Sequence, residues 1–412
     1  MTESEGADMT TRHGGSSPSL PASLPDDGDL LWEILLRLPP EPSSLPGASA
    51  VCKRWRRLVT DSQFIRRFRA HHRTPSLLGV FEFQERKIVF RSIMDSSDRI
   101  PPDRFDLGRC SIRSDNELIG CWHGRVLVHN HVLKQVVVCA PMTGEQRRVA
   151  VPCGFPGAFI NGAVLCAASD QGHVHGSCHS SPFKVVLLSM LSKENRILAR
   201  VYSSESRVWG KLISIATPSP FSFAGARATL VGNALYWPIL PSWDGILEFD
   251  LKKQSLVAIM GFPVKGNFHN HRIIQAKDGA VGLVLLCYPR LQMWQKNING
   301  QDVSTWVLSK TIYLHNHYTG SRAQGSSAVN ILGLSRQIEE QIRGAKTILG
   351  YSEDIDVILI SVGGTVYMVQ LKSMKSKRFY ESHYELGYHL FTSFYTPGAT
   401  VAGGCNGAKL LH

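Results

Sequence analysis

Residues 24–40 read LPDDGDLLWEILLRLPP, and residues 44–59 read SLPGASAVCKRWRRLV. Ser23 and the Asp side chains of the first stretch can cap a helix, and they precede apolar residues that recur at helical spacing from Leu30 to Leu38. Pro39 and the proline that follows it then stop the pattern. This stretch therefore predicts an amphipathic helix that ends before residue 39.

The second stretch predicts another helix, from about residue 45 to 59, with one apolar stripe and a basic opposite face. A third short helix is expected after Asp61, with Phe64 and Phe68 facing inward. Together they predict a three-helix unit over residues 24–70. A unit of about fifty residues buries little surface by itself, so we expect some of its apolar side chains to need a partner.

From residue 77 onward the apolar pattern changes from helical to alternating, with roughly twenty short runs typical of strands. Similar units begin at Gly124, Gly232 and Gly363, each reading as glycine, strand, loop, strand and polar turn. Repeats of ~40 to 50 residues are typical of propeller blades. We predict a large all-β propeller-like domain of about six or seven blades, with a pair of β-sandwiches as the alternative.

The composition fits a folded chain with flexible ends. Among 412 residues, 43% are apolar and 19% are charged, which is enough apolar surface for a sizeable core. Residues 1–22 are rich in Ser, Gly, Thr and Pro and predict a disordered tail, and residues 402–412 predict a frayed end. The longest apolar run, residues 280–288, is shorter than the ~20 residues of a membrane helix. We expect a soluble protein of the cytoplasm, the nucleus or both.

Charge and cysteine content narrow the classes of partner and site. The formal net charge of +12 favours acidic partners, and part of it is local, because eight basic residues and one acid lie in residues 53–73. Nine cysteines with no Cys-x-x-Cys pair indicate reduced thiols rather than a disulfide framework or a zinc ribbon. His173, His175, Cys178 and His179 fall within seven residues, but the run has no spaced second half, so we interpret it as a loop without a metal.

Sequence signatures of catalysis and cofactor binding are missing. The chain has no Gly-x-Gly-x-x-Gly, no phosphate-binding Gly-x-x-x-x-Gly-Lys-Ser/Thr, no Gly-x-Ser-x-Gly and no His-Glu-x-x-His. We therefore predict a protein without catalytic residues and without a cofactor.

The N-terminal helical segment closely resembles the F-box motif. The residues that carry the resemblance are Leu24-Pro25-Asp26-Asp27, the Glu-Ile-Leu helix, Val51-Cys52-Lys53-Arg54-Trp55, Asp61 and Phe64. The continuation, residues 66–79, is similar to the plant subfamily whose remaining chain is a propeller-like F-box-associated region. The resemblance implies an F-box over residues 23–74 and a propeller-like domain over residues 75–401.

Such a family implies a substrate receptor of a Skp–cullin–F-box ubiquitin ligase, in which other subunits carry out the chemistry. The F-box would bind an acidic Skp-type linker, and through it a cullin, while the β domain would bind a protein target that the sequence does not identify. Apolar anchors surrounded by charge suit such docking. The predicted anchors are Leu24, Pro25, Ile34, Leu38, Leu45, Val51, Cys52 and Trp55.

Two other functions are kept as alternatives: a basic nucleic-acid-binding protein, and a scaffold that acts without the ligase. Against nucleic acid, the aromatic residues of the basic stretch fall at core spacing rather than on a stacking surface. Target contacts are expected in loops at one rim of the β domain. Its candidate rim aromatics, each favoured as core over contact, are Trp122, Trp209, Trp243 and Trp294.

Overall fold

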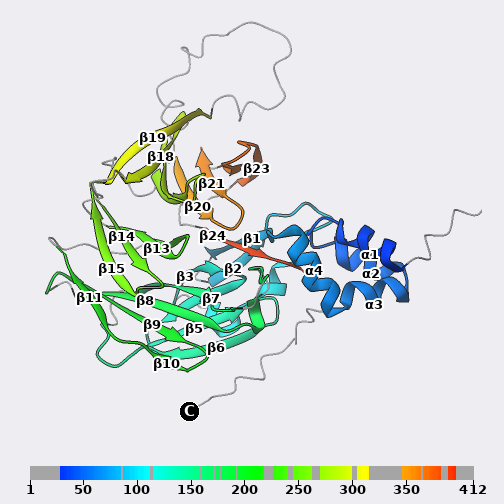
Figure 1. The fold of residues 1–412 in the computed structure, drawn as a ribbon, viewed down its shortest axis with the longest axis horizontal. Helices are drawn as coiled ribbons and strands as arrows, with labels where there is room; N and C mark the ends of the chain where they lie inside the picture. The colour runs from blue at the N-terminus through cyan, green and yellow to red at the C-terminus, as the bar shows by residue number, and fades with distance from the viewer. Residues whose placement is uncertain are drawn as a thin grey trace, which may run out of the picture.

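The computed structural model describes residues 28–84, 87–111, 115–156, 160–169, 172–176, 178–191, 193–217, 226–239, 245–261, 270–298, 304–314, 346–362, 365–381 and 388–395. The predicted tail, the predicted frayed end, and the anchors Leu24 and Pro25 lie outside these residues. Figure 1 shows two parts, a small group of helices and a larger ring of sheets.

Four helices form the N-terminal part: α1 (Gly28–Leu36), α2 (Ser44–Val51), α3 (Lys53–Thr60) and α4 (Ser62–His72). The prediction of three helices was wrong in one respect, because the expected helix over residues 45–59 is divided at Cys52. The backbone of Cys52 is extended (φ −160°, ψ 170°), and its Sγ accepts a hydrogen bond from the backbone N–H of Trp55 at 3.5 Å. Cys52 thus ends one helix and caps the next.

The start of α4 matches its sequence signal. Asp61 Oδ1 accepts hydrogen bonds from the backbone N–H groups of Gln63 at 2.8 Å and Phe64 at 3.0 Å, which satisfies two donors that a helix N-terminus leaves open. No helix among the described residues is long and apolar enough to cross a membrane.

The described strands form six antiparallel sheets. The first sheet joins β2 (Lys87–Ser92), β1 (Ser76–Gln84) and β24 (His389–Ser393). The second sheet contains β3 (Asn116–Trp122), β4 (Arg125–Asn130), β5 (Gln135–Ala140) and β6 (Glu145–Ala150). The third contains β7 (Ile160–Cys166), β8 (Phe183–Leu191), β9 (Arg196–Ser203), β10 (Val208–Trp209) and β11 (Ile213–Ala216).

The other three sheets each have four strands in chain order. They are β12 (Thr229–Val231), β13 (Ala234–Pro238), β14 (Gly245–Asp250) and β15 (Ser255–Met260); β16 (His271–Gln275), β17 (Val281–Cys287), β18 (Arg290–Ile298) and β19 (Ser304–Tyr313); and β20 (Thr347–Ser352), β21 (Val357–Val362), β22 (Thr365–Gln370) and β23 (Ser376–Glu381). Short 3-10 helices η1 (Pro102–Phe105), η2 (Gly108–Ser111) and η3 (Cys178–Ser180) lie between strands.

One end strand of each sheet contacts an end strand of the next sheet around a ring: β24 contacts β3, β3 contacts β7, β12 contacts β16, β16 contacts β20, and β20 contacts β24. Between β7 and the next sheet, Asn161 accepts a hydrogen bond from Trp237 Nε1 at 2.9 Å and donates one to the Ala226 carbonyl at 2.8 Å. This is a six-bladed propeller, so the estimate of six or seven blades is settled at six and the sandwich alternative is excluded.

The ring is closed by pairing the two ends of the domain. The last strand, β24, pairs antiparallel with β1, the first strand after the helices. The rings of Phe81, Phe90 and Phe105 lie 5.4, 6.3 and 5.5 Å from the ring of Phe391 on β24. An aromatic cluster therefore fastens the C-terminal strand to the N-terminal hairpin.

Candidate partner-binding surface

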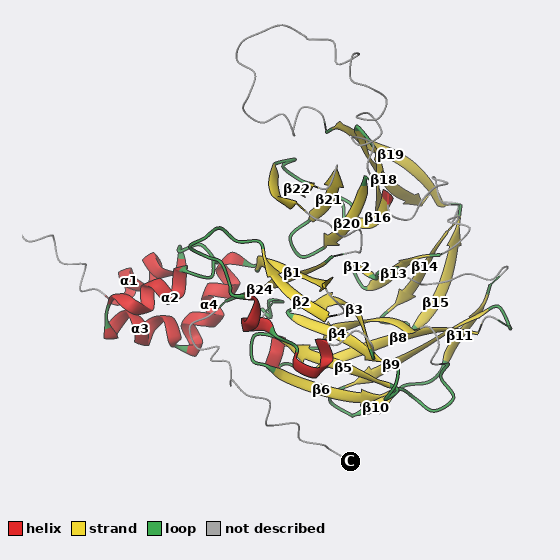
Figure 2. Cartoon of the chain, turned by 180° about the vertical axis from the view of Figure 1, so that it is seen from behind, coloured by secondary structure: helices red, strands yellow, loops and turns green. Residues whose placement is uncertain are grey.

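The helical unit has a closed core on one side. Its buried residues are Leu31, Leu35, Leu36, Leu45, Ala48, Val59, Phe64, Phe68 and Phe394. The last of these comes from the segment after β24, so the propeller supplies one side chain to the helical core. Figures 1 and 2 both show α4 beside β1 and β24.

Two polar contacts hold the loop between α1 and α2 against the propeller. Ser76 Oγ donates a hydrogen bond to the Pro40 carbonyl at 2.6 Å, and the backbone N–H of Ser43 donates to Asp98 Oδ1 at 2.8 Å. Next to this loop, where α1 ends, His72 Nε2 donates to the Leu36 carbonyl at 3.1 Å, and burial lowers the pKa of this imidazole. This side of the helical unit is therefore already occupied by the propeller.

The helical unit also exposes large apolar residues to solvent. Leu30 and Ile34, one turn apart on α1, are 45% and 38% exposed, and Val51 at the end of α2 is 57% exposed. Cys52 next to it is exposed as well. Apolar side chains left in water on so small a unit mark a surface that suits a partner.

The structure separates the predicted anchors into three groups. Ile34, Val51 and Cys52 are exposed, and Leu38 and Trp55 are half-buried beside the helical core. Leu45, predicted to be an anchor, is instead 1% exposed and packs inside the unit. Leu45 and Ala48, three residues apart on α2, share the buried face of this short helix.

One exposed residue was missed. Leu30 was assigned only to the apolar pattern of the first helix, although its spacing of four residues from Ile34 is the signal that both lie on one face.

The exposed cations of the helical unit lie on α3 and α4, the two helices that follow the exposed apolar residues of α1 and α2. Lys53, Arg54, Arg56 and Arg57 on α3 are all exposed, as are Arg66 and Arg67 on α4. Phe64 and Phe68 are buried, as the core spacing predicted, so they present no aromatic surface to a stacked base. The face combines apolar anchors with cations that attract an acidic partner.

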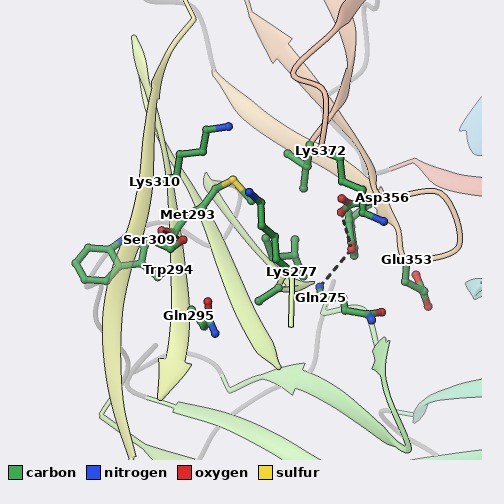
Figure 3. A pocket seen from close by; sticks show the side chains of 14 residues that line it. Gln275, Lys277, Met293, Trp294, Gln295, Ser309, Lys310, Glu353, Asp356 and Lys372 are labelled. Atoms are coloured by element: carbon green, nitrogen blue, oxygen red, sulfur yellow. Dashed lines mark hydrogen bonds between the residues drawn. The ribbon is translucent and has the colours of Figure 1, made fainter. Parts of the chain in front are cut away.

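A second candidate site is a cavity of about 310 Å³ between the blade of β16–β19 and the blade of β20–β23. Three exposed lysines line it, Lys277, Lys310 and Lys372, as does Met293 (Figure 3).

The carboxyl groups at this cavity are biased toward their neutral forms. Burial raises the pKa of Asp356, which accepts a hydrogen bond from Tyr351 Oη at 3.2 Å. Burial, with the charge of neighbouring Asp354, raises the pKa of Glu353 to about 8. Three lysine side chains beside two acids whose pKa values are raised favour an acidic group in the cavity.

The predicted rim tryptophans lie in different places. Trp122 is buried in the propeller core, and Trp209 packs against that core while its Nε1 donates to the Ala150 carbonyl at 3.0 Å. Trp243 lies outside the described residues. Trp294 is at the cavity, but in Figure 3 its ring points away from Lys372.

A third cluster was interpreted from the sequence as a loop without a metal. Ligand atoms of His173, His175 and Cys178 lie within 4.8 Å of one another and of Cys166 Sγ. Cys166, at the end of β7, is the residue that the sequence interpretation left out of the cluster.

Comparison with known families agrees with both parts of the fold. The F-box domain family matches residues 22–67, which include the four helices up to the middle of α4. The family described as F-box protein AT5G49610-like, beta-propeller, matches residues 117–391, from β3 into β24. An F-box followed by a propeller of this family fits a plant-type F-box protein. The chain belongs to the AT5G49610-like family of F-box propeller proteins, which confirms the resemblance.

Other comparisons add little. No curated protein matches the chain. A solved nidogen/laminin complex is 11% identical, with 76% of this chain and 98% of that chain covered and a TM-score of 0.38. Hsv2 of Kluyveromyces marxianus is 12% identical over 57% of this chain and 68% of that chain, with a TM-score of 0.32. These likenesses are too weak to bear on function.

Proposed function

We propose that this protein is the substrate-recognition subunit of a Skp–cullin–F-box ubiquitin ligase. Its F-box would bind a Skp-type linker and, through it, a cullin, while the propeller binds a protein target in the cytoplasm or the nucleus. Ubiquitin transfer would be carried out by other subunits. The observation that supports this most directly is the exposure of Leu30, Ile34 and Val51 on a unit that packs against the propeller through other residues.

The location of this face explains how one chain can bind two proteins. Because Phe394 and the Ser76–Pro40 hydrogen bond occupy the inner side of the unit, only the outer side is open to a linker. Buried apolar anchors supply affinity, and the surrounding arginines mainly raise the association rate with an acidic surface. We therefore expect the association rate to fall as salt is added, with a smaller change in the dissociation rate.

A matched pair of substitutions tests the docking face. Val51 is 57% exposed on α2, and Val132 is 61% exposed in the turn between β4 and β5. In the full chain, Val51→Asp should weaken binding to a purified Skp-type linker at least about tenfold, because it replaces an apolar contact of more than about 1 kcal/mol with a charge that an acidic partner repels. Val132→Asp makes the same chemical change on the propeller and should leave the affinity unchanged. Equal affinities for the two variants, measured by calorimetry, would refute this docking face.

The same experiment addresses the alternatives. If the linker binds but no cullin co-purifies with it, the protein is a scaffold that acts without the ligase. If the chain binds RNA or DNA with an affinity that falls steeply with salt, the basic helices serve a nucleic acid.

For the target, we propose that the cavity between the last two blades contacts an acidic group. Lys277 and Lys310 from one blade and Lys372 from the other converge on it. Lys310→Glu should reduce the recovery of proteins that bind the wild-type propeller, whereas Lys193→Glu, an exposed lysine after β8, should not. Identical sets of captured proteins from both variants would argue that the target binds elsewhere.

A further inference from the structure

Four potential metal ligands lie close together at the C-terminal end of β7. The Nε2 atom of His173 lies 3.3 Å from the Sγ of Cys166 and 3.3 Å from the Sγ of Cys178. The Nδ1 atom of His175 lies 3.6 Å from the Sγ of Cys178. Each residue contributes one atom, and all four atoms lie within 4.8 Å of one another.

These distances suit a tetrahedral ion. With zinc–sulfur bonds of about 2.3 Å and zinc–nitrogen bonds of about 2.0–2.1 Å, the sulfur and nitrogen corners of a tetrahedron lie about 3.6 Å apart. The distances of 3.3 to 3.6 Å are within a few tenths of an ångström of that edge. Two cysteines and two histidines are also one of the ligand sets that closed, structural zinc sites use.

The surrounding structure holds the ligands in place. The backbone N–H of Ala168 donates a hydrogen bond to Cys166 Sγ at 3.4 Å, and the backbone N–H of Cys166 donates to His123 Nδ1 at 3.0 Å. The ring of His123 stacks on the ring of His175, with centroids 3.8 Å apart and planes 12° from parallel. Partners of this kind orient the ligands of metal sites.

The second sulfur is held from the other side. Arg125, which is almost fully buried, donates hydrogen bonds from Nη2 to the carbonyl of Cys178 and, at 2.6 Å, to the carbonyl of Ser181. This guanidinium fixes the backbone of η3, where Cys178 is the first residue.

We propose that Cys166, His173, His175 and Cys178 form a structural zinc site. A disulfide between the two cysteines is the main competing outcome, but it would leave His173, which is equally close to both sulfurs, without a role. With four protein ligands there is no open position for a substrate, so the ion would stabilise the fold and not act in a reaction.

The site would act on the junction between the propeller and the F-box. Val174, between the two histidine ligands, packs against the helical core. The carbonyl of Gly176 accepts hydrogen bonds from the backbone N–H of Phe394 at 3.0 Å and from Ser393 Oγ at 2.6 Å. Gly176 has a φ of +104°, and a Cβ there would lie 2.7 Å from Pro75, so the loop follows the chain that joins the two domains. Zinc would hold this loop and thereby fix the orientation of the F-box.

The test measures metal on the full chain and does not depend on the ligase role. The reduced protein, purified with zinc and then dialysed, should retain about one zinc per chain by elemental analysis. Replacing zinc with Co²⁺ should give the intense visible absorption of a tetrahedral site and the charge-transfer band of thiolate ligands. Cys166→Ser and His173→Ala should each weaken zinc binding by more than the roughly 10–100-fold that losing an outer hydrogen bond costs.

Matched controls lie close by. Cys153→Ser removes an exposed thiol and His179→Ala a histidine of the same segment, and neither belongs to the four, so both variants should keep the metal. The proposal is overturned if the folded, reduced wild-type chain binds no zinc, if its cobalt spectrum is octahedral, or if the control variants lose as much metal as the ligand variants. A Cys166–Cys178 disulfide in protein isolated from cells under thiol-trapping conditions overturns it too. The cobalt and zinc measurements on the wild-type chain decide the matter even where a ligand variant fails to fold.

Discussion

Phe394 is the side chain through which the propeller completes the core of the F-box, and its replacement by alanine should release the helical unit. Phe394 is 2% exposed and packs with Phe64, Phe68 and the leucines of α1 and α2. It follows β24 directly, and its backbone N–H is held by the Gly176 carbonyl at 3.0 Å. The alanine variant keeps that backbone bond and removes only the ring.

The expected cost follows from burial and size. Replacing a buried phenylalanine with alanine costs about 3–5 kcal/mol, including the cavity that it leaves. Helices α1–α4 span 45 residues, and at about 0.05–0.15 kcal/mol per residue their whole stability would be only about 2–7 kcal/mol. The loss is therefore comparable to the entire stability of the unit, while the propeller has its own cores.

Phe391 provides the matched control. It lies three residues earlier, on β24, is 1% exposed, and packs with residues of the propeller in the cluster around Phe81, Phe90 and Phe105. Hydrogen–deuterium exchange on the full chain separates the two effects, since each peptide reports its own region. Phe394→Ala should remove protection from residues 28–72 and leave β4, β8 and β17 protected, whereas Phe391→Ala should raise exchange in β1 and β2.

If Phe394→Ala left exchange of α1–α4 unchanged, the helical core would not depend on the propeller, and the two domains would not be coupled through this side chain. A rise in exchange across the propeller to the same extent in both variants would also exclude a specific coupling of Phe394 to the helices.

Three further changes test local features. Burial lowers the pKa of His129 to about 4, whereas an unfolded histidine has a pKa of about 6.5. The stability that the neutral imidazole contributes is therefore present above about pH 6.5 and is lost as the pH falls toward 4, about 2 kcal/mol of it by about pH 5. In urea titrations, His129→Gln should lose less stability than the wild-type chain over this interval. Asp61→Ala should cost about 1 kcal/mol in thermal melts, because the N–H of Phe64 loses its cap, and Asp61→Asn should recover most of it. Gly162→Ala should lower the stability by more than about 2 kcal/mol, because a Cβ would lie 2.2 Å from a backbone oxygen of β8. Gly47→Ala in α2, where a Cβ meets nothing within 4 Å, should instead raise the stability by up to about 1 kcal/mol. Similar melting temperatures for the two glycine variants would contradict the packing described.

The helical unit was predictable because its signals are local. The capping role of Asp61 and the inward positions of Phe64 and Phe68 follow from spacing alone, and the structure agrees with them. The break at Cys52 was not predictable in this way, since the residues next to it include no proline or glycine and continue the apolar stripe. A cysteine sulfur acting as a helix cap is visible only in the fold.

The repeats predicted a propeller but not which strand of a blade each repeat unit begins with. Gly124 and Gly232 each precede the second strand of a blade, β4 and β13, so those two units are equivalent. The third unit leads into β22, the third strand of its blade, and is therefore shifted by one strand. Because a glycine followed by an alternating strand occurs before the second strand of one blade and before the third strand of another, sequence similarity alone did not place the hairpins within their blades.

For the proposed zinc site and the cavity, the sequence could not show which residues lie close together in the fold. Three of the four proposed zinc ligands were recognised as a run, but the run looked incomplete because Cys166, the last residue of β7, stands seven positions before His173. The cavity lysines come from two blades and are up to 95 positions apart, from Lys277 to Lys372, so no local pattern joins them.

The junction has a consequence for experiments that divide the chain. Strand β1 closes the propeller by pairing with β24, and the residue that follows β24 completes the helical core. An F-box fragment that stops near residue 74 therefore lacks Phe394, and a propeller fragment that starts near residue 75 exposes it. Weak linker binding by the isolated F-box would then reflect an incomplete core and not a missing docking face. Supplying the propeller fragment in trans should restore part of the binding if this reasoning is correct, and a Phe394→Ala propeller fragment should restore none.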